Sequence, residues 1–323
     1  MSEHILRAYC LDGQGGAEAV APSGIRAALD GDKPVWVHLD AGHPDTEDWM
    51  NREIPFLDPH IVAALVADET RPRMAEAGGG TLLFLRGVNL NENADPEDMV
   101  SIRLWVDGKR IISARRRRLK AVTDIDNSLK AGKGPKNTGD FICDLIYRLF
   151  ERMQPFVTQL DDETDFVEER LLDGADPSLR EAIVNVRMQA IRFRRYMAPQ
   201  RDAIGQLRMS EPGWMTEKHL RHLTESHNHV TRYVEDLDAI RERSQIIKDE
   251  IANVLADRLN KNMYVLSVIA AIFLPLGFLT GLLGINVGGI PGAENQLSFW
   301  IFCAILIALV GLQVWLFRKL KWF

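Results

Sequence analysis

The chain has few cysteines and none of the short motifs that mark common enzyme classes. Its three cysteines, Cys10, Cys143 and Cys303, form no Cys-x-x-Cys pair, which argues against a disulfide framework and a zinc knuckle. A P-loop, a Gly-x-Ser-x-Gly elbow and a His-Glu-x-x-His motif are also missing from the sequence. We therefore expect a protein that is not an enzyme and that uses no cofactor.

The chain also lacks a clustered basic excess. Its 323 residues carry a formal net charge of −6, whereas nucleic-acid-binding domains are usually basic on one face. The one basic run, residues 115–118, has no interleaved aromatic residues that could stack on bases. We expect no nucleic-acid partner, and we interpret this run as a solvated strand end or a subunit contact.

Charge is absent from two apolar runs near the C-terminus, residues 263–283 and 297–317. Each has 21 residues, which at about 1.5 Å per residue spans roughly the ~30 Å hydrocarbon core of a bilayer. The alternative is a pair of buried helices in a soluble core, but such helices usually carry a polar stripe. The runs predict a transmembrane hairpin over residues 263–323, with an outer loop over 284–296.

Basic residues flank both predicted spans on the same side of the membrane. These residues are Arg258, Lys261, Arg318, Lys319 and Lys321, whereas the loop contains neither lysine nor arginine. The positive-inside rule then places both termini in the cytoplasm. The first residues show no basic segment followed by an apolar stretch, so we expect no export signal.

Residues 1–135 alternate strand-like and helix-like segments, which predicts a cytoplasmic α/β domain. We expect strands over 5–11, 35–40, 81–89, 100–106 and 111–113, and a helix over 61–69. Asp107-Gly108 separates the last two strands and predicts a hairpin with a type I′ turn, which needs positive φ at both residues.

Residues 136–262 have a helical pattern, with breaks expected at 173–174, at Pro199 and at 211–213. After the last break, 61 residues over 214–274 contain no glycine or proline. We therefore predict a long stalk helix from about residue 214 that continues into the first span. Such a helix needs neighbours, because helical stability comes mostly from packing an apolar face.

One face of this predicted helix changes from acidic to small and polar, then to apolar, then to small. Its members are Glu235, Asp238, Glu242, Gln245, Asp249, Asn253, Ala256, Asn260, Met263, Ser267, Ala270, Leu274, Gly277 and Gly281. Copies of the helix around an axis would form an acidic vestibule from Glu235, Asp238 and Glu242, leading to a narrow apolar stretch. The alternative for the acidic half is a solvated face. The small residues in the span either pack helices or line a path, and both interpretations need partner helices.

A single hairpin cannot enclose a channel, so a transport function requires a homo-oligomer with closed symmetry. Gly284, Ile285 and Asn286 end the first span, and Asn286 would place one carboxamide per subunit at the outer mouth. Neutral oxygens there suit a hydrated divalent ion, which gives up water reluctantly. Asp249 and Asn286 are thus the main candidate metal-binding residues of the path.

Four of the eight histidines lie in one eleven-residue segment of the predicted stalk helix: His219, His222, His227 and His229. The i, i+3 spacing of His219 and His222 would let them share a metal, and His229 lies on the same face two turns further along the helix. No acid or cysteine completes a tetrahedral set, so surface histidines are the default interpretation.

The end of the first span, the short loop, the second span and the basic, aromatic C-terminus resemble the CorA-type two-transmembrane metal ion transporters with a Gly-x-Asn motif. Four features resemble the ZntB zinc-transport branch most: Gly284-Ile285-Asn286, the loop over 287–292, Thr70-Arg71-Pro72-Arg73 and the run over 194–202. Leu283 and Gly277 depart from the magnesium branch, which tends to have an aromatic residue and a threonine there.

The resemblance implies an α+β membrane protein: a homopentamer in a bacterial inner membrane, with a funnel-shaped cytoplasmic α/β domain and a long pore-lining helix. The implied pore residues are Asp249, Met263, Leu274, Gly277 and Asn286. The implied activity is zinc transport, with proton-coupled uptake as one option. Zinc efflux and a magnesium, cobalt or nickel channel are the alternatives, and a membrane-anchored scaffold or metal sensor is a more distant one. Neither span contains an ionisable proton relay.

Overall fold

The computed structural model describes residues 3–174, 176–285, 290, 292 and 295–319. The chain divides into two compact units, Met1–Asp249 and Glu250–Phe323, and each is described by itself. Asn286 and Glu294 lie outside the described residues, and so does most of the predicted outer loop.

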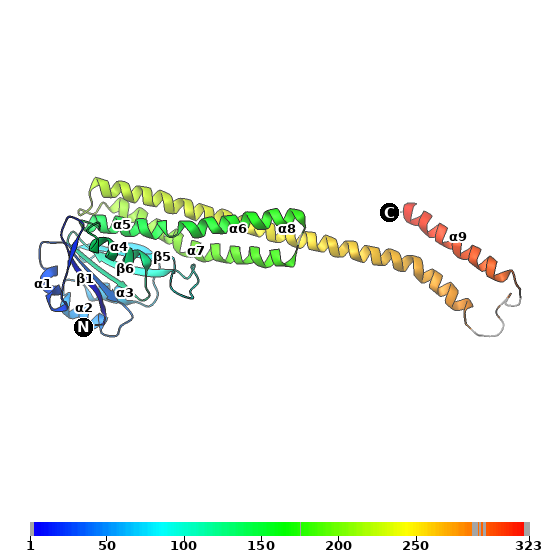
Figure 1. Ribbon diagram of the computed structural model, residues 1–323, viewed down its shortest axis with the longest axis horizontal. Coiled ribbons are helices and arrows are strands. Elements are labelled where there is room, and N and C mark those ends of the chain that lie inside the picture. Colours follow the sequence, from blue (N-terminus) through cyan, green and yellow to red (C-terminus); the bar gives the residue numbers. More distant parts are fainter. Residues whose placement is uncertain (1–2, 175, 286–289, 291, 293–294, 320–323) are drawn as a thin grey trace. The chain divides into compact units, whose positions relative to one another are not determined.

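The first unit contains a seven-stranded sheet with the order β2-β1-β3-β7-β6-β5-β4 (Figure 1). The strands are β1 (Ile5–Leu11), β2 (Ala17–Ala19), β3 (Val35–Asp40), β4 (Arg73–Ala77), β5 (Gly80–Gly87), β6 (Val100–Val106) and β7 (Arg110–Arg115). Only β3 and β7 pair in parallel, which requires a crossover, and the other neighbours are antiparallel. The prediction of an α/β domain is confirmed.

Successive side chains of a strand point to opposite faces of the sheet, and an apolar core lies on each face. In β3, Val35, Val37 and Leu39 belong to a core with α1 (Ile25–Leu29), α2 (Thr46–Glu53) and α3 (Pro59–Val66). Trp36 belongs to the opposite core, with α4 (Lys120–Lys130) and α5 (Thr138–Glu151). Figure 1 shows these two groups of helices on the two faces of the sheet.

Long helices follow: α6 (Gln154–Asp173), α7 (Pro177–Ser210), α8 (Glu217–Leu283) and α9 (Ser298–Lys319), and a short 3₁₀ turn, η1 (Pro22–Gly24), precedes α1. Helices α6 and α7 and the first part of α8 extend the core that contains Trp36. Leu223, Val230 and Leu237 on the first part of α8 are fully buried in that core. Their seven-residue spacing places them on one face, so packing within the first unit holds this part of α8.

Two local predictions are corrected. Pro199 does not break the helix, because α7 runs through it while the neighbouring Met197 and Gln200 are buried against the rest of the unit. The hairpin between β6 and β7 exists, but neither Asp107 nor Gly108 has positive φ. Instead, the Asp107 carboxylate accepts the backbone N–H groups of Lys109 and Arg110 at 2.9 and 2.7 Å, which closes a three-residue loop.

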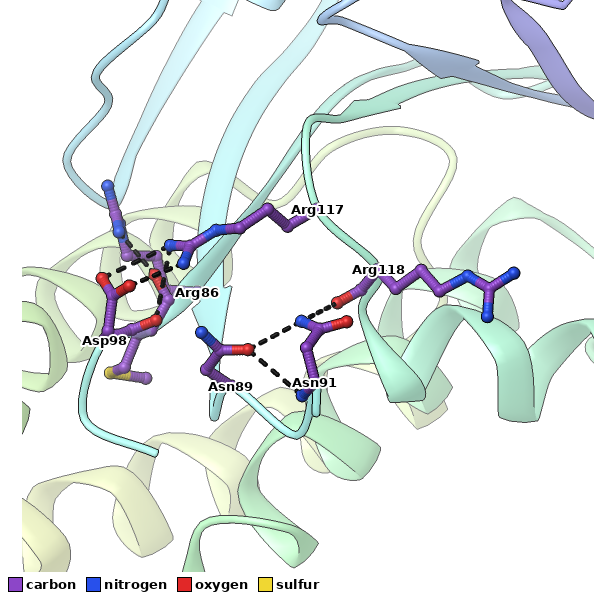
Figure 2. A network of polar contacts seen from close by, with 7 residues as sticks. Arg86, Asn89, Asn91, Asp98, Arg117 and Arg118 are labelled. Carbon is purple, nitrogen blue, oxygen red and sulfur yellow. Dashed lines mark hydrogen bonds and ion pairs between the residues drawn. The ribbon is translucent and has the colours of Figure 1, made fainter. Parts of the chain in front are cut away.

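The basic run begins at the end of β7 and is tied to neighbouring loops. Arg117 forms an ion pair with Asp98 at 2.6 Å, and the Asn91 amide donates to the backbone carbonyl of Arg118 at 3.1 Å, as Figure 2 shows. Arg116 pairs with Asp68 at 2.6 Å. The interpretation of this run as a strand end is confirmed.

The second unit contains the rest of α8 and α9. Both helices contain segments that are long and apolar enough to cross a membrane, and hardly any residue of these segments is buried within the chain. Leu274 and Ile307, for example, are 72% and 73% exposed. The helices end at Leu283 and Lys319, close to the ends predicted for the two spans.

Candidate functional site

The acidic part of the predicted stripe lies on the solvent side of α8 in the first unit. Glu235 and Glu242 are exposed, as expected for a vestibule. Asp238 is only half-exposed, and its carboxylate pairs with Arg194 of α7 at 2.5 Å and with Arg241 at 3.1 Å. Two of the three predicted vestibule carboxylates therefore face water, while Asp238 also holds α8 to α7.

Asp249 is an exposed carboxylate at the end of the first unit. The Gln245 amide donates to Asp249 Oδ2 at 2.7 Å, and Lys248 Nζ lies 3.6 Å from Oδ1. The hydrogen bond from Gln245 lowers the pKa of Asp249 below its ordinary 3.8, and Lys248 adds to this shift. The group is thus ionised at neutral pH and can attract a hydrated cation through water.

The stripe residues of the second unit are exposed as well. Asn260, Met263 and Leu274 are all exposed, with Met263 at 58%. A Cβ atom built on Gly277 or Gly281 would meet no atom of the described residues within 4 Å. Contacts among these residues therefore do not explain why these two positions are small. Either another chain packs there or a path needs the space.

The C-terminal end of α8 has its own hydrogen-bonding pattern. The Gly284 N–H donates to the carbonyl of Thr280 at 2.9 Å, and a Cβ atom on Gly284 would lie 2.8 Å from that same oxygen. Glycine at 284 thus lets the chain turn tightly at the end of the first span. Ile285 follows, with 49% of its surface exposed, and Asn286 lies outside the described residues.

The histidines of α8 do not form one cluster. His219 is buried rather than on the surface: its Nδ1 accepts the Thr216 N–H at 3.1 Å, and its Nε2 lies 3.1 Å from Asp140 Oδ1. Both ring nitrogens are therefore occupied. His222 and His229 line a cavity of about 690 Å³ in the first unit. No metal-binding group of three His, Cys, Asp or Glu residues found among the described residues includes any of these three histidines.

One cluster of possible metal ligands was not predicted. His43 and Asp45 lie in one turn, whereas His4 is distant in the sequence, and the sheet brings their ligand atoms together. Their sequence spacing matches no metal motif, so only the pairing of β1 with β3 reveals them.

Comparison with known proteins covers nearly the whole chain. A family described as "CorA-like Mg2+ transporter protein" matches residues 31–319. A divalent cation transporter, CmaX of Pseudomonas aeruginosa, is 39% identical over 323 residues, covering 98% of this chain and 96% of that protein. A zinc transport protein, ZntB of Yersinia enterocolitica, is 36% identical over 314 residues, covering 97% and 94%. A solved structure of full-length CmaX is similar with a TM-score of 0.87 at 37% identity, covering 100% of this chain and 99% of that chain.

Proposed function

The chain belongs to the CorA-like Mg²⁺ transporter family, and we propose that it carries divalent cations across a membrane, with zinc as its main ion. The resemblance seen in the sequence is thereby confirmed at the level of the family. The observation that carries the proposal is the full-length match to divalent cation transporters in a chain with two exposed apolar helices. Zinc is favoured by the ZntB relative, whose name states that ion.

We place the ion path on the stripe of α8, at the centre of a homopentamer. The open space at Gly277 and Gly281 and the exposure of Met263 and Leu274 support this placement. Copies of the helix arranged with this face inward bury it against a common axis, which a single chain cannot do. The remaining exposed apolar side chains of α8 and α9 then face lipid or neighbouring helices.

Glu235, Glu242 and the ionised Asp249 line the cytoplasmic end of the proposed path. Carboxylate rings raise the local cation concentration, and an apolar throat without charges holds no ion tightly. The Asn286 carboxamide supplies neutral oxygens at the outer mouth, where a hydrated ion can bind and leave. Any proton coupling uses carboxylates or histidines outside the membrane, because neither span contains an ionisable relay. We place the protein in a bacterial inner membrane, with both termini in the cytoplasm.

Flux into liposomes tests the proposal. Full-length protein is reconstituted into liposomes that contain a dye responsive to the ion under test, and entry of Zn²⁺, Co²⁺, Ni²⁺ and Mg²⁺ is followed with and without a pH gradient. We expect zinc entry in the wild type, near-complete loss in Asn286→Ala and a clear reduction in Asp249→Asn. Asp257→Asn, which removes an exposed acid off the stripe, is the matched control and should transport normally.

The results separate the alternatives. If Mg²⁺, Co²⁺ or Ni²⁺ enters faster than Zn²⁺, that ion replaces zinc as the main ion of the proposal. If ions move only from the cytoplasmic face of the protein to the other face, the direction is efflux. If no divalent ion moves through protein that is folded and oligomeric, transport is excluded, and an anchored scaffold or sensor replaces it. Normal flux in Asn286→Ala would remove the assignment of the outer mouth.

A further inference from the structure

Three potential metal ligands meet at one end of the sheet in the first unit. One ring nitrogen each of His4 and His43 and a carboxylate oxygen of Asp45 all lie within 4.8 Å of one another. The fold brings them together because β1 pairs with β3: Ile5 lies opposite Leu39, and the Asp40 N–H donates to the His4 carbonyl at 2.8 Å. His43 and Asp45 lie in the turn that connects β3 to α2.

His4 carries the strongest sign of a missing ligand. Only 6% of its surface is exposed, and its Nε2 atom is buried without a hydrogen-bond partner among the described residues. Its ring contacts those of His43 and Trp49, with the centroids 5.5 Å away in each case. A buried ring nitrogen without a partner is unfavourable, and native structures usually explain such atoms by a water, an ion or a functional role.

The other two groups leave the cluster open to solvent. The side chain of His43 is 25% exposed and that of Asp45 is 74% exposed, and His43 Nδ1 lies 3.8 Å from Asp45 Oδ2. An ion can therefore reach the cluster from water, and the exposed Asp45 side chain can turn to accommodate it. All three ligand atoms lie within 4.8 Å of one another, so small side-chain rotations would bring them onto one zinc ion.

The chemistry of the three donor groups indicates which ions they suit. Two imidazoles and one carboxylate are typical ligands of zinc and related transition metals, whereas Mg²⁺ prefers oxygen ligands and retained water.

We propose that His4, His43 and Asp45 bind one divalent transition-metal ion of the zinc class, with water completing the coordination. The ion would link the start of β1 to the turn after β3. This site belongs to the first unit and does not depend on the proposed ion path. The simpler alternative is that His4 only packs against Trp49, and the experiment below distinguishes the two.

Metal content provides the test. Purified full-length protein in detergent is loaded with Zn²⁺, passed over a desalting column and analysed for zinc per chain, and Co²⁺ is used in parallel for its visible ligand-field spectrum. The variants are His43→Ala and Asp45→Asn. His60→Ala removes an exposed histidine from α3 and is the matched control. Asp45→Asn changes an exposed side chain, so loss of folding does not confuse the result.

We expect the zinc content of the wild type and of His60→Ala to exceed that of His43→Ala by one ion per chain. Loss of a residue that only supports a metal ligand usually lowers metal affinity by roughly 10–100-fold. Loss of a ligand in His43→Ala or Asp45→Asn should lower zinc affinity by at least as much. The Co²⁺ spectrum should change in His43→Ala and stay unchanged in His60→Ala. Asn286→Ala should keep this ion, so a failed transport proposal leaves the site intact. Equal zinc content and equal Co²⁺ spectra in wild type, His43→Ala and Asp45→Asn would overturn the proposal.

Discussion

Gln313 on α9 donates its side-chain N–H to the carbonyl oxygen of Ala271 on α8 at 3.2 Å. Ala271 lies four residues before Pro275, which has no N–H to complete the helical hydrogen bond to that carbonyl. Gln313 therefore supplies the partner that Pro275 removes. The proline and the glutamine form one local arrangement that fixes α8 against α9 within the second unit.

We predict that Gln313→Leu destabilises the protein by about 1 kcal/mol, the usual net contribution of a hydrogen bond. The cost should shrink in a Pro275→Ala background, because that substitution restores the helical N–H and the Ala271 carbonyl no longer depends on Gln313. The measurement is a double-mutant cycle on the free energy of unfolding in detergent. Equal costs in the two backgrounds would show that the two residues act independently.

Gly139 makes room for the buried His219 ring. A Cβ atom at residue 139 would lie 2.2 Å from His219 Nδ1, the nitrogen that accepts the Thr216 N–H. We predict that Gly139→Ala destabilises the first unit by about 1–3 kcal/mol, which is typical of overpacking. The readout is the free energy of unfolding of the full chain.

Gly213→Ala is the control for this substitution. A Cβ atom there meets nothing within 4 Å, and the residue has no positive φ. It should change stability by only a few tenths of a kcal/mol. If Gly139→Ala proves equally neutral, the His219 ring does not occupy the position that the structure gives it.

His38 on β3 makes the first unit sensitive to acid. Its ring is fully buried beside Ser113 Oγ, at 2.8 Å, and burial lowers the pKa of His38 from 6.5 to about 3, with Arg115 and Arg7 adding to the shift. Between these two pH values only the unfolded chain binds the proton. Stability should therefore fall as the pH decreases from 6.5 towards 3, by roughly a few kcal/mol at most.

Leucine at residue 38 tests this dependence. His38→Leu keeps a similar volume but cannot bind a proton, so its unfolding free energy should vary less between pH 7 and pH 4 than that of the wild type. His60→Gln removes an exposed histidine and should leave the wild-type slope unchanged. Identical slopes for His38→Leu and wild type would assign the acid sensitivity to other groups.

The sequence predicts elements well where one local pattern dominates. Strands β1, β3 and β6 have the predicted bounds because β-branched and apolar residues predominate in them, and α8 follows from the long stretch without glycine or proline. Strands β2 and β4 were missed because they are short and lie at the two edges of the sheet. There, pairing with one neighbour matters more than the local pattern.

Tertiary contacts explain most other differences. Pro199 remains in α7 because packing outweighs the hydrogen bond that the proline removes. The turn between β6 and β7 needs no positive φ, because the Asp107 side chain accepts the backbone hydrogen bonds that close it. The prediction of a surface position for His219 was wrong because its partner Asp140 lies 79 residues away. Helical spacing alone places Asp249 and the other stripe residues on one face of α8, whereas the pairing of Asp238 with Arg194 depends on how α7 packs.

Gly277 offers the most direct test of the ion path. In the part of the chain that the structure describes, a Cβ atom at Gly277 meets nothing within 4 Å, and the same is true of Gly311 on α9. Both helix-interior glycines therefore have room for a larger side chain there, and replacing glycine favours the helix by about 0.5–1 kcal/mol. A large side chain at 277 matters only if copies of α8 surround that position.

We predict that Gly277→Leu abolishes most zinc flux into liposomes, because a leucine from every subunit would fill the narrow part of the path. Gly311→Leu is the matched control, since it adds the same volume in open space on the other helix, and it should transport normally. Unfolding temperature and oligomer size, measured by light scattering in detergent, should match the wild type in both variants. Normal flux through Gly277→Leu would place this face of α8 away from the path.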